Sequence, residues 1–199
     1  QPDQNVENDW DELRLTVNQG VHGAQDNACA ITRMGLKCQF FAGNRHELEF
    51  KAFVQDFGKA AMTFRFLKRM KVGIIGKMAG MNDILADEMS VLKKIGPEYR
   101  YDAIGAVVQY MNETTKEEID ARIAYDREIF DLDPELSYES HYEAIKMYLG
   151  FKKYLDARNL DAFTAQFDIF CEDGRFKQLP LLAASHLMAD GYGYAAEGD

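Results

Sequence analysis

The sequence predicts an α/β protein in which helices flank a mostly parallel β-sheet. An apolar run at residues 37–42, a long segment of helical periodicity at 47–70 and a second apolar run at 72–75 follow one another. Strand, helix and strand in this order form a βαβ unit, whose two strands are parallel. The chain has 199 residues, of which 47% are hydrophobic and 28% charged, so it can bury a core of its own.

The first third of the chain combines short segments with one long helix. Alternating apolar residues predict a short strand at 13–17, and Asn and Gly residues predict a loop at 18–23. A helix is expected at 24–34, where Gly35 supplies the carboxyl-terminal cap. In the long helix at 47–70 the apolar residues recur on one face, with a kink expected near Gly58.

The remaining chain is predicted to be mainly helical. A Gly- and Met-rich loop follows the strand at 72–75, and a further strand is expected at 162–167. Helices are expected at 86–95, 103–111, 116–130, 138–157 and 179–188. Gly96 and Pro97 end the first of these helices, Thr114 or Thr115 caps the third, and Pro180 opens the last.

Composition and missing motifs exclude several functional classes. A formal net charge of −10 repels phosphate backbones, so nucleic acid is not an expected partner. The three cysteines contain no Cys-x-x-Cys pair, which indicates reduced thiols and a cytoplasmic protein. No apolar run approaches the roughly 20 residues of a membrane span, and residues 1–11 lack the apolar core of a signal peptide. The motifs of phosphate-binding loops, dinucleotide-binding folds, zinc proteases and serine hydrolases are absent.

The final nine residues, GYGYAAEGD, are the most informative stretch. They place Glu197 on a glycine-rich, aromatic-flanked segment directly after an apolar helix. Glycine permits close approach of a ligand to the backbone, and segments that follow packed elements often carry chemistry. Taken alone, however, a glutamate in such a segment is more often a solvated surface acid.

Three runs of residues resemble the L-arabinose isomerase family. Residues 187–199, LMADGYGYAAEGD, are similar to its GYG-x-x-x-EGD run; residues 18–23, NQGVHG, to its NQ-x-x-HG run; and residues 163–167 to its FT-x-x-F strand. The resemblance is strongest over 150–199 and weakest over 96–137. It implies Rossmann-like or flavodoxin-like layers. Residues 1–70 would then be the carboxyl-terminal part of a first α/β domain, and residues 71–199 a central α/β domain.

The resemblance also implies an activity and a set of site residues. Members of the family interconvert L-arabinose and L-ribulose through an ene-diol, with a divalent metal that is usually Mn²⁺. Glu197 would be a metal ligand and the catalytic acid/base. Gln19 and His22 would contact the sugar across the interface of a homo-oligomer, which is a hexamer in this family. Met81 and Phe167 would line the sugar pocket, although the loop at 76–83 departs from the usual family pattern and leaves the preferred sugar open.

Alternatives to an active isomerase remain. A second glutamate and two histidines complete the family's metal site and have no counterpart in this sequence, so we expect an interior fragment that is inactive by itself. A non-catalytic α/β sugar-binding or interaction module is one alternative, and a purely structural α/β domain is another. His141, near a helix start, is expected to be exposed, and His186 to be a structural histidine.

Overall fold

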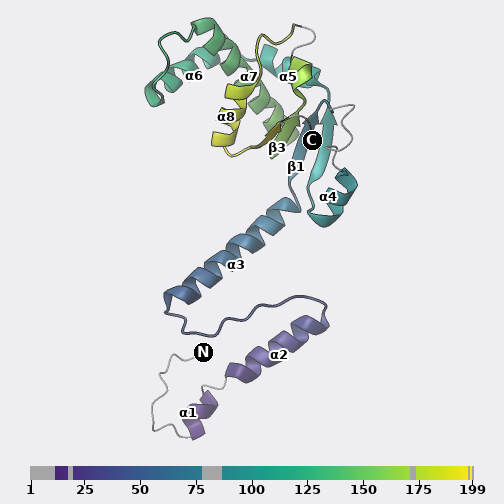
Figure 1. Cartoon of the computed structure of the whole chain (residues 1–199), viewed down its shortest axis with the longest axis vertical. Coiled ribbons are helices and arrows are strands. Elements are labelled where there is room, and N and C mark those ends of the chain that lie inside the picture. Colours follow the sequence, from purple (N-terminus) through teal and green to yellow (C-terminus); the bar gives the residue numbers. More distant parts are fainter. Residues whose placement is uncertain (1–11, 18–19, 78–86, 171–173, 197, 199) are drawn as a thin grey trace. The chain divides into compact units, whose positions relative to one another are not determined.

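The computed structural model describes residues 12–17, 20–77, 87–170, 174–196 and 198 (Figure 1). The chain divides into two compact units, Gln1–Thr63 and Phe64–Asp199. The assignment of residues 1–70 and 71–199 to two domains of the family stays a prediction.

The first unit is helical where it is regular. It contains α1 (Glu12–Val17), α2 (Gly20–Arg33) and most of α3 (Leu48–Leu67). The strand predicted at 13–17 is wrong, because these residues form α1. The predicted loop is wrong for residues 20–23, which open α2, while residues 18–19 lie outside the described residues.

The strand predicted at 37–42 is also wrong, and with it the βαβ unit that it would have opened. Residues 36–42 have no regular secondary structure. A strand requires a neighbouring strand for its backbone hydrogen bonds, and the described part of this unit offers none. Instead, Phe41 packs on α3, with its ring centroid 5.6 Å from that of Phe50 and 5.3 Å from that of Phe53.

The two helices predicted in this unit are confirmed. Gly35 ends α2 with φ of +76°, its amide donates to the carbonyl of Thr32, and the Leu36 amide donates to that of Ile31. This pair of bonds is the Schellman arrangement that a glycine in the left-handed region allows. The helix α3 continues through Gly58 without interruption.

The second unit is built on a four-stranded, all-parallel sheet with strand order β2-β1-β3-β4. The strands are β1 (Lys71–Ile75), β2 (Glu98–Asp102), β3 (Ala162–Ala165) and β4 (Gly193–Ala196). The predicted α/β class with a mostly parallel sheet is therefore confirmed. Two strands were not predicted: β2 is a polar edge strand, and β4 lies in the glycine-rich segment before Glu197.

All five helices predicted after β1 are present. They are α4 (Glu88–Lys94), α5 (Ile104–Asn112), α6 (Lys116–Ile129), α7 (Tyr138–Arg158) and α8 (Leu181–Ala189). Side chains close three of their amino termini: Asp87 caps α4, Thr115 forms a capping box with Glu118 at α6, and Ser137 caps α7.

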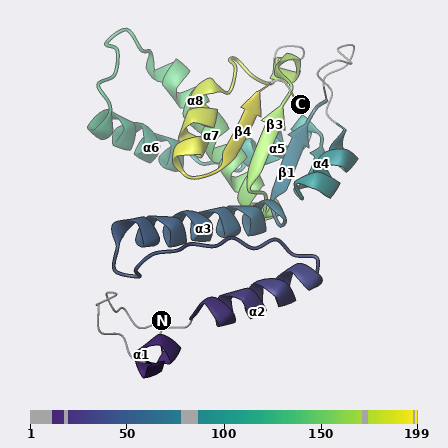
Figure 2. The ribbon, with the colours of Figure 1, turned by 60° about the horizontal axis from the view of Figure 1, so that its bottom comes forward.

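The helices α5, α7 and α8 bury one face of this sheet (Figure 2). Ile75, Phe163 and Ala165 point from the strands into that core, and the Phe163 ring lies 5.0 Å from the ring of Phe151 on α7. Gly150 lets α5 and α7 approach closely, since a Cβ there would lie 2.9 Å from the Cα of Met111. Each large apolar side chain fully buried in this way contributes about 1.5–3 kcal/mol.

A buried ionic cluster joins α6, α7 and α8. The Asp126 carboxylate is 1% exposed and accepts hydrogen bonds from the Nε of Arg122 at 2.9 Å and from the Nε2 atoms of His141 and His186, each at 3.0 Å. The prediction that His141 is exposed is wrong, because Asp126 draws its ring into the interior. The structural role predicted for His186 agrees with its place in this cluster.

The partners of His186 fix its tautomer. Its Nδ1 lies 2.8 Å from the Nη2 of Arg122, which can only donate, so Nδ1 accepts and Nε2 carries the proton given to Asp126. Burial lowers the pKa of His186 below its ordinary 6.5, against the opposing charge of Asp126. The neutral ring is thus the form that fits the folded state.

We expect the stability of this unit to decline in mild acid. His186 has a lower pKa in the folded than in the unfolded chain, so the unfolded chain binds more protons as the pH falls below 6.5. The contribution of His186 is complete above pH 6.5 and is lost below it. Urea unfolding at pH 7.5 and 5.5 measures this loss, and His186→Gln should reduce it. An equal pH dependence in both proteins would contradict the assignment.

Candidate functional site

The carboxyl ends of the parallel strands form the candidate site. The strand β1 lies between β2 and β3. The chain runs from β1 to β2 on one side of β1 and later continues with β3 on the other side, so the strand order reverses at β1. Such a point, where the strand order reverses, is where open α/β sheets bind ligands. We call the meeting place of the carboxyl ends of β1 and β3 the switch point.

Two glycines allow the backbone to pack tightly at the switch point. Gly76 follows β1 with φ of +69°, and Gly198 follows β4 with φ of +84°. A Cβ on Gly198 would lie 3.0 Å from the Cβ of Gln166 and 3.1 Å from the carbonyl oxygen of Gly76. Residue 198 therefore lies directly against the ends of β1 and β3, and both its φ and its surroundings require glycine.

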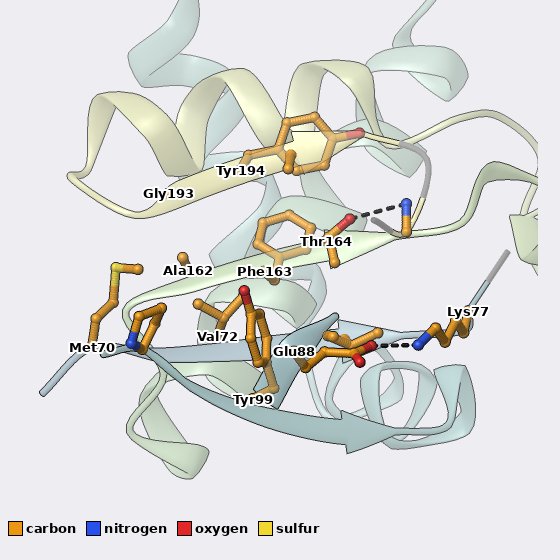
Figure 3. Close-up of a pocket in the computed structure, with 14 residues that line it drawn as sticks. Met70, Val72, Lys77, Glu88, Tyr99, Ala162, Phe163, Thr164, Gly193 and Tyr194 are labelled. Atoms are coloured by element: carbon orange, nitrogen blue, oxygen red, sulfur yellow. Dashed lines mark hydrogen bonds and ion pairs between the residues drawn. The ribbon is translucent and has the colours of Figure 1, made fainter. Parts of the chain in front are cut away.

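The hydroxyl of Thr164 holds this arrangement together. Its Oγ1 accepts the amide proton of Gly198 at 3.0 Å, in a buried position on β3 (Figure 3). The strand β4 is also paired with β3 up to Ala196, opposite Ala165. Residues 196 and 198 are thus both attached to β3.

A hollow of about 320 Å³ leads from the sheet face to the switch point. We call it the sheet hollow. Val72, Ile74, Ala162 and Thr164 contribute to its lining. Met70 and Pro97 line it just before β1 and β2 begin, and Lys77 and Gly198 line it just after β1 and β4 end, with Glu88 bonded to Lys77. Figure 3 labels Met70, Val72, Lys77, Glu88, Ala162 and Thr164. Its volume is within the range of about 300–1,000 Å³ typical of small-molecule sites. Its lining is mainly apolar, with polar groups at the carboxyl end.

An ionic cluster borders the carboxyl end of the sheet hollow. Glu88 accepts hydrogen bonds from the Nζ of Lys77 and, at 2.6 Å, from the hydroxyl of Tyr101 (Figure 3 shows the first). The Lys77 bond, then the Tyr101 bond, lowers the pKa of Glu88 to about 2. Burial, then the bond to Glu88, raises the pKa of Tyr101 to about 12. The ion pair joins Lys77, which follows β1, to Glu88, the first residue of α4.

The end of β3 adds polar groups and an aromatic ring. Gln166 is buried, and its Nε2 donates to the carboxylate of Asp168 at 2.8 Å. Phe167 opens a short 3₁₀ turn and is 44% exposed. An exposed phenyl ring beside an amide and a carboxylate is a combination able to contact both the apolar and the hydroxyl faces of a sugar.

The predicted site residues fall in different parts of the chain. Phe167 lies beside the switch point, as just described. His22 is exposed in the first turn of α2, in the first unit. Gln19, Met81 and Glu197 lie outside the described residues, although Glu197 stands between residues 196 and 198, which are attached to β3.

The comparison with known proteins adds to this geometry. A family model, the L-arabinose isomerase central domain, matches residues 77–199. The chain belongs to the L-arabinose isomerase family. The matched range includes the candidate site from Lys77 through Gly198.

Individual relatives extend the similarity toward the amino terminus. The L-arabinose isomerase of Clostridium beijerinckii is 31% identical over 186 residues, which cover 93% of this chain and 37% of the relative. L-arabinose isomerase 1 of Clostridium acetobutylicum is 30% identical, over 93% of this chain and 38% of the relative. The Geobacillus kaustophilus L-arabinose isomerase is 27% identical, over 96% of this chain and 40% of the relative. The chain therefore spans about two fifths of the length of these relatives.

Several residues of the site were missed in the sequence. Thr164 and Gln166 are inside the FT-x-x-F run, where only Phe167 was singled out. Lys77 and Glu88 are 11 positions apart in the sequence, and their pairing has no sequence pattern. The sequence signal available for Thr164 was the alternation of side chains along a strand. Because Phe163 faces the core, Thr164 must point to the opposite face of the sheet.

We expect Gly198→Ala to destabilise the protein more than Gly174→Ala. Both glycines have positive φ, but an added Cβ is crowded at Gly198 and meets nothing within 4 Å at Gly174. The left-handed backbone alone costs about 1–2 kcal/mol for alanine, and crowding adds to that cost at Gly198. Equal changes in the free energy of unfolding, measured with urea, would show that residue 198 is not packed as described.

The cluster at Glu88 makes a second prediction. In Glu88→Gln the hydroxyl of Tyr101 no longer faces a carboxylate, so its pKa should fall below about 12, while burial, the larger cause, keeps it above its ordinary 10. ¹³C NMR titration of the tyrosine rings measures the change. Glu98→Gln is the matched control, because Glu98 is an exposed residue on the same strand that pairs with Arg100. A Tyr101 pKa that is unaffected by Glu88→Gln would refute the cluster.

Proposed function

We propose that this chain is part of an aldose–ketose isomerase that converts L-arabinose to L-ribulose. The attachment of the backbone on both sides of Glu197 to β3, at the switch point of a sheet in the matched central domain, carries the proposal. Its support is that Gly198, the residue after Glu197, lines the sheet hollow and is bonded to Thr164 of β3.

In the proposed reaction the carboxylate of Glu197 moves a proton between adjacent sugar carbons. It removes the proton from C2 of the aldose, which leaves an ene-diol, and returns a proton to C1, while a hydroxyl proton passes from O2 to O1. General base catalysis of this kind requires a carboxylate within hydrogen-bond reach of the carbon acid. Phe167 and Met81 would line the sugar pocket, and the exposed carboxylate of Asp168, which already accepts from Gln166, would also accept hydrogen bonds from sugar hydroxyls.

A divalent metal, Mn²⁺, is part of the proposal, with Glu197 as a ligand. When bound, such a cation stabilises the negative charge that develops on the enolate oxygen. No group of three or more His, Cys, Asp or Glu side chains suited to a metal occurs among residues 12–17, 20–77, 87–170, 174–196 and 198. The described residues by themselves do not make a metal site, so the further ligands would come from other parts of the protein.

We also propose a homo-oligomer in which Gln19 and His22 reach the sugar site of a neighbouring subunit. The exposure of His22 on α2 leaves it accessible for such a contact. Within the part of the chain that the structure describes, no helix has both the length and the apolar character needed to cross a bilayer. A cytoplasmic location and the isomerase activity of the whole protein belong to the same proposal.

The main competing function is a metal-independent sugar-binding module on the same scaffold. The observation that favours this alternative is the sheet hollow, whose lining is mainly apolar with polar groups at one end, because such a lining can contact a sugar without a metal.

Calorimetric titration of the whole protein, of which this chain is proposed to be a part, with L-arabinose in the presence and absence of Mn²⁺ separates the two functions. The isomerase proposal expects sugar binding that is strengthened by Mn²⁺ and weakened at least about tenfold by Glu197→Gln, since the charged ligand is lost. Sugar binding that is equal with and without Mn²⁺, and equal in Glu197→Gln, would establish the module instead. Phe167→Ala should weaken sugar binding in either case.

Turnover by the isolated chain is a separate question. We expect no conversion of L-arabinose to L-ribulose by the purified chain with Mn²⁺, because a single identified ligand cannot complete the metal site. Ketose formation above the level of Glu197→Gln would show that the chain carries a complete catalytic site.

A further inference from the structure

Helix α8 buries little apolar surface for its length. Its buried residues are Ala183, Ala184, His186 and Leu187, of which His186 is 3% exposed. An alanine side chain is a single methyl group, and burial stabilises a fold by roughly 25 cal/mol per Å² of apolar area. The polar bonds of His186 therefore contribute a large part of the attachment of α8 to the rest of the unit.

Charged and titratable groups face His186 from the two helices packed against it and from its own segment. They are Arg122 and Asp126 on α6, His141, Tyr148 and Lys152 on α7, and Asp190 directly after α8. Four of these groups form ion pairs, Arg122 with Asp126 at 2.9 Å and Lys152 with Asp190 at 3.5 Å. With both histidines neutral, the positive and negative charges of the set are equal, so a further proton leaves it with a net positive charge.

A second proton on His186 is incompatible with this arrangement. Its Nδ1 accepts a hydrogen bond from the Nη2 of Arg122 at 2.8 Å, whereas a protonated Nδ1 would itself be a donor. Two donors and two positive charges would then face each other. Arg122 stays on α6, because its Nε donates to Asp126 at 2.9 Å, so the ring of His186 has to move away, and α8 with it.

His141 differs from His186 although both belong to the same cluster. Its Nε2 donates to the same oxygen of Asp126 at 3.0 Å. Among the described residues no hydrogen bond to its other ring nitrogen occurs, and His141 lines a hollow of about 210 Å³ between the end of α6 and the start of α7. A second proton on His141 therefore displaces no donor, and only His186 opposes an arginine.

We propose that His186 makes the attachment of the α8–β4 segment, residues 181–196, sensitive to pH. The neutral ring holds this segment on α6 and α7, and a second proton on Nδ1 releases it while the core between α5, α7 and the strands β1 to β3 stays folded. Burial lowers the pKa of His186 below its ordinary 6.5, so the released segment binds more protons and is favoured as the pH falls. The inference does not rest on the proposed function.

Amide hydrogen exchange of the 199-residue chain, followed by NMR at pH 7.5 and 5.5, tests this release. Each rate is divided into the rate of an unstructured peptide at the same pH, which gives a protection factor. If the segment opens by itself, the amides of α8 and of Gly193 have protection factors at least about tenfold lower than those of Phe151 and Leu155 in the core of α7. Acidification to pH 5.5 should lower the protection of the segment by up to about tenfold, since one pH unit below 6.5 corresponds to about 1.4 kcal/mol.

His186→Gln and His141→Gln are the matched variants. Both replace a histidine that donates to the same oxygen of Asp126, and a glutamine amide can still donate there. Glutamine does not titrate, so His186→Gln should remove the fall in protection between pH 7.5 and 5.5, whereas His141→Gln should retain it. If His186→Gln does not fold, Arg122→Gln replaces it: glutamine can accept the proton of a charged His186, so the fall should be smaller than in the wild-type chain.

Each result supports or overturns the inference. Equal protection of α7 and the segment in the wild-type chain would refute a local release, because the segment would then open only with the whole unit. Protection of the segment that is the same at both pH values would refute its sensitivity to pH. A fall that persists in His186→Gln, or is unchanged in Arg122→Gln, would refute the assignment to His186, and a fall that is lost in His141→Gln would assign the proton uptake to His141 instead.

Discussion

The central position of β1 in an all-parallel sheet governs the arrangement of the site. The strand β1 pairs in parallel with β2 on one side and with β3 on the other. The carboxyl ends of all three strands therefore lie at the same edge of the sheet, with the end of β1 in the middle. Gln166 follows β3 and Gly198 follows β4 at this edge, where backbone groups are no longer paired in the ladder. The carboxyl-terminal motif then reaches the switch point because β4 is parallel to β3.

The helical layer supports the edge strand that carries this motif. The buried carboxylate of Asp126 joins α6 to α7 and α8, and α8 leads directly into β4. Tyr148 on α7 donates to Asp190 at 2.7 Å, just after the end of α8. Both contacts fix the place from which β4 starts, so an ionic cluster far from the switch point contributes to the geometry there.

Tight backbone packing and a polar border occur together at the carboxyl edge. The glycines at 76 and 198 bring the ends of the strands into contact, and Thr164 pairs the amide that would otherwise be buried without a partner. Beside them the ion pair of Lys77 and Glu88 gives the otherwise apolar sheet hollow a charged end. Apolar walls with a few oriented polar groups are typical of sites for small polar ligands.

The sequence by itself determined the class of the protein, most of its helices and its family motifs. Helical periodicity and capping residues are local properties, which explains why the capping box at Thr115 and the glycine cap at Gly35 were predictable. Only the tertiary structure decided which apolar runs became strands: residues 37–42 did not, whereas the polar residues Glu98–Asp102 did. Strand pairing depends on a neighbour that is distant in sequence. The contacts of Thr164 with Gly198, of Lys77 with Glu88 and of His141 with Asp126 are decided in the same way, because each joins residues that only the folded chain brings together.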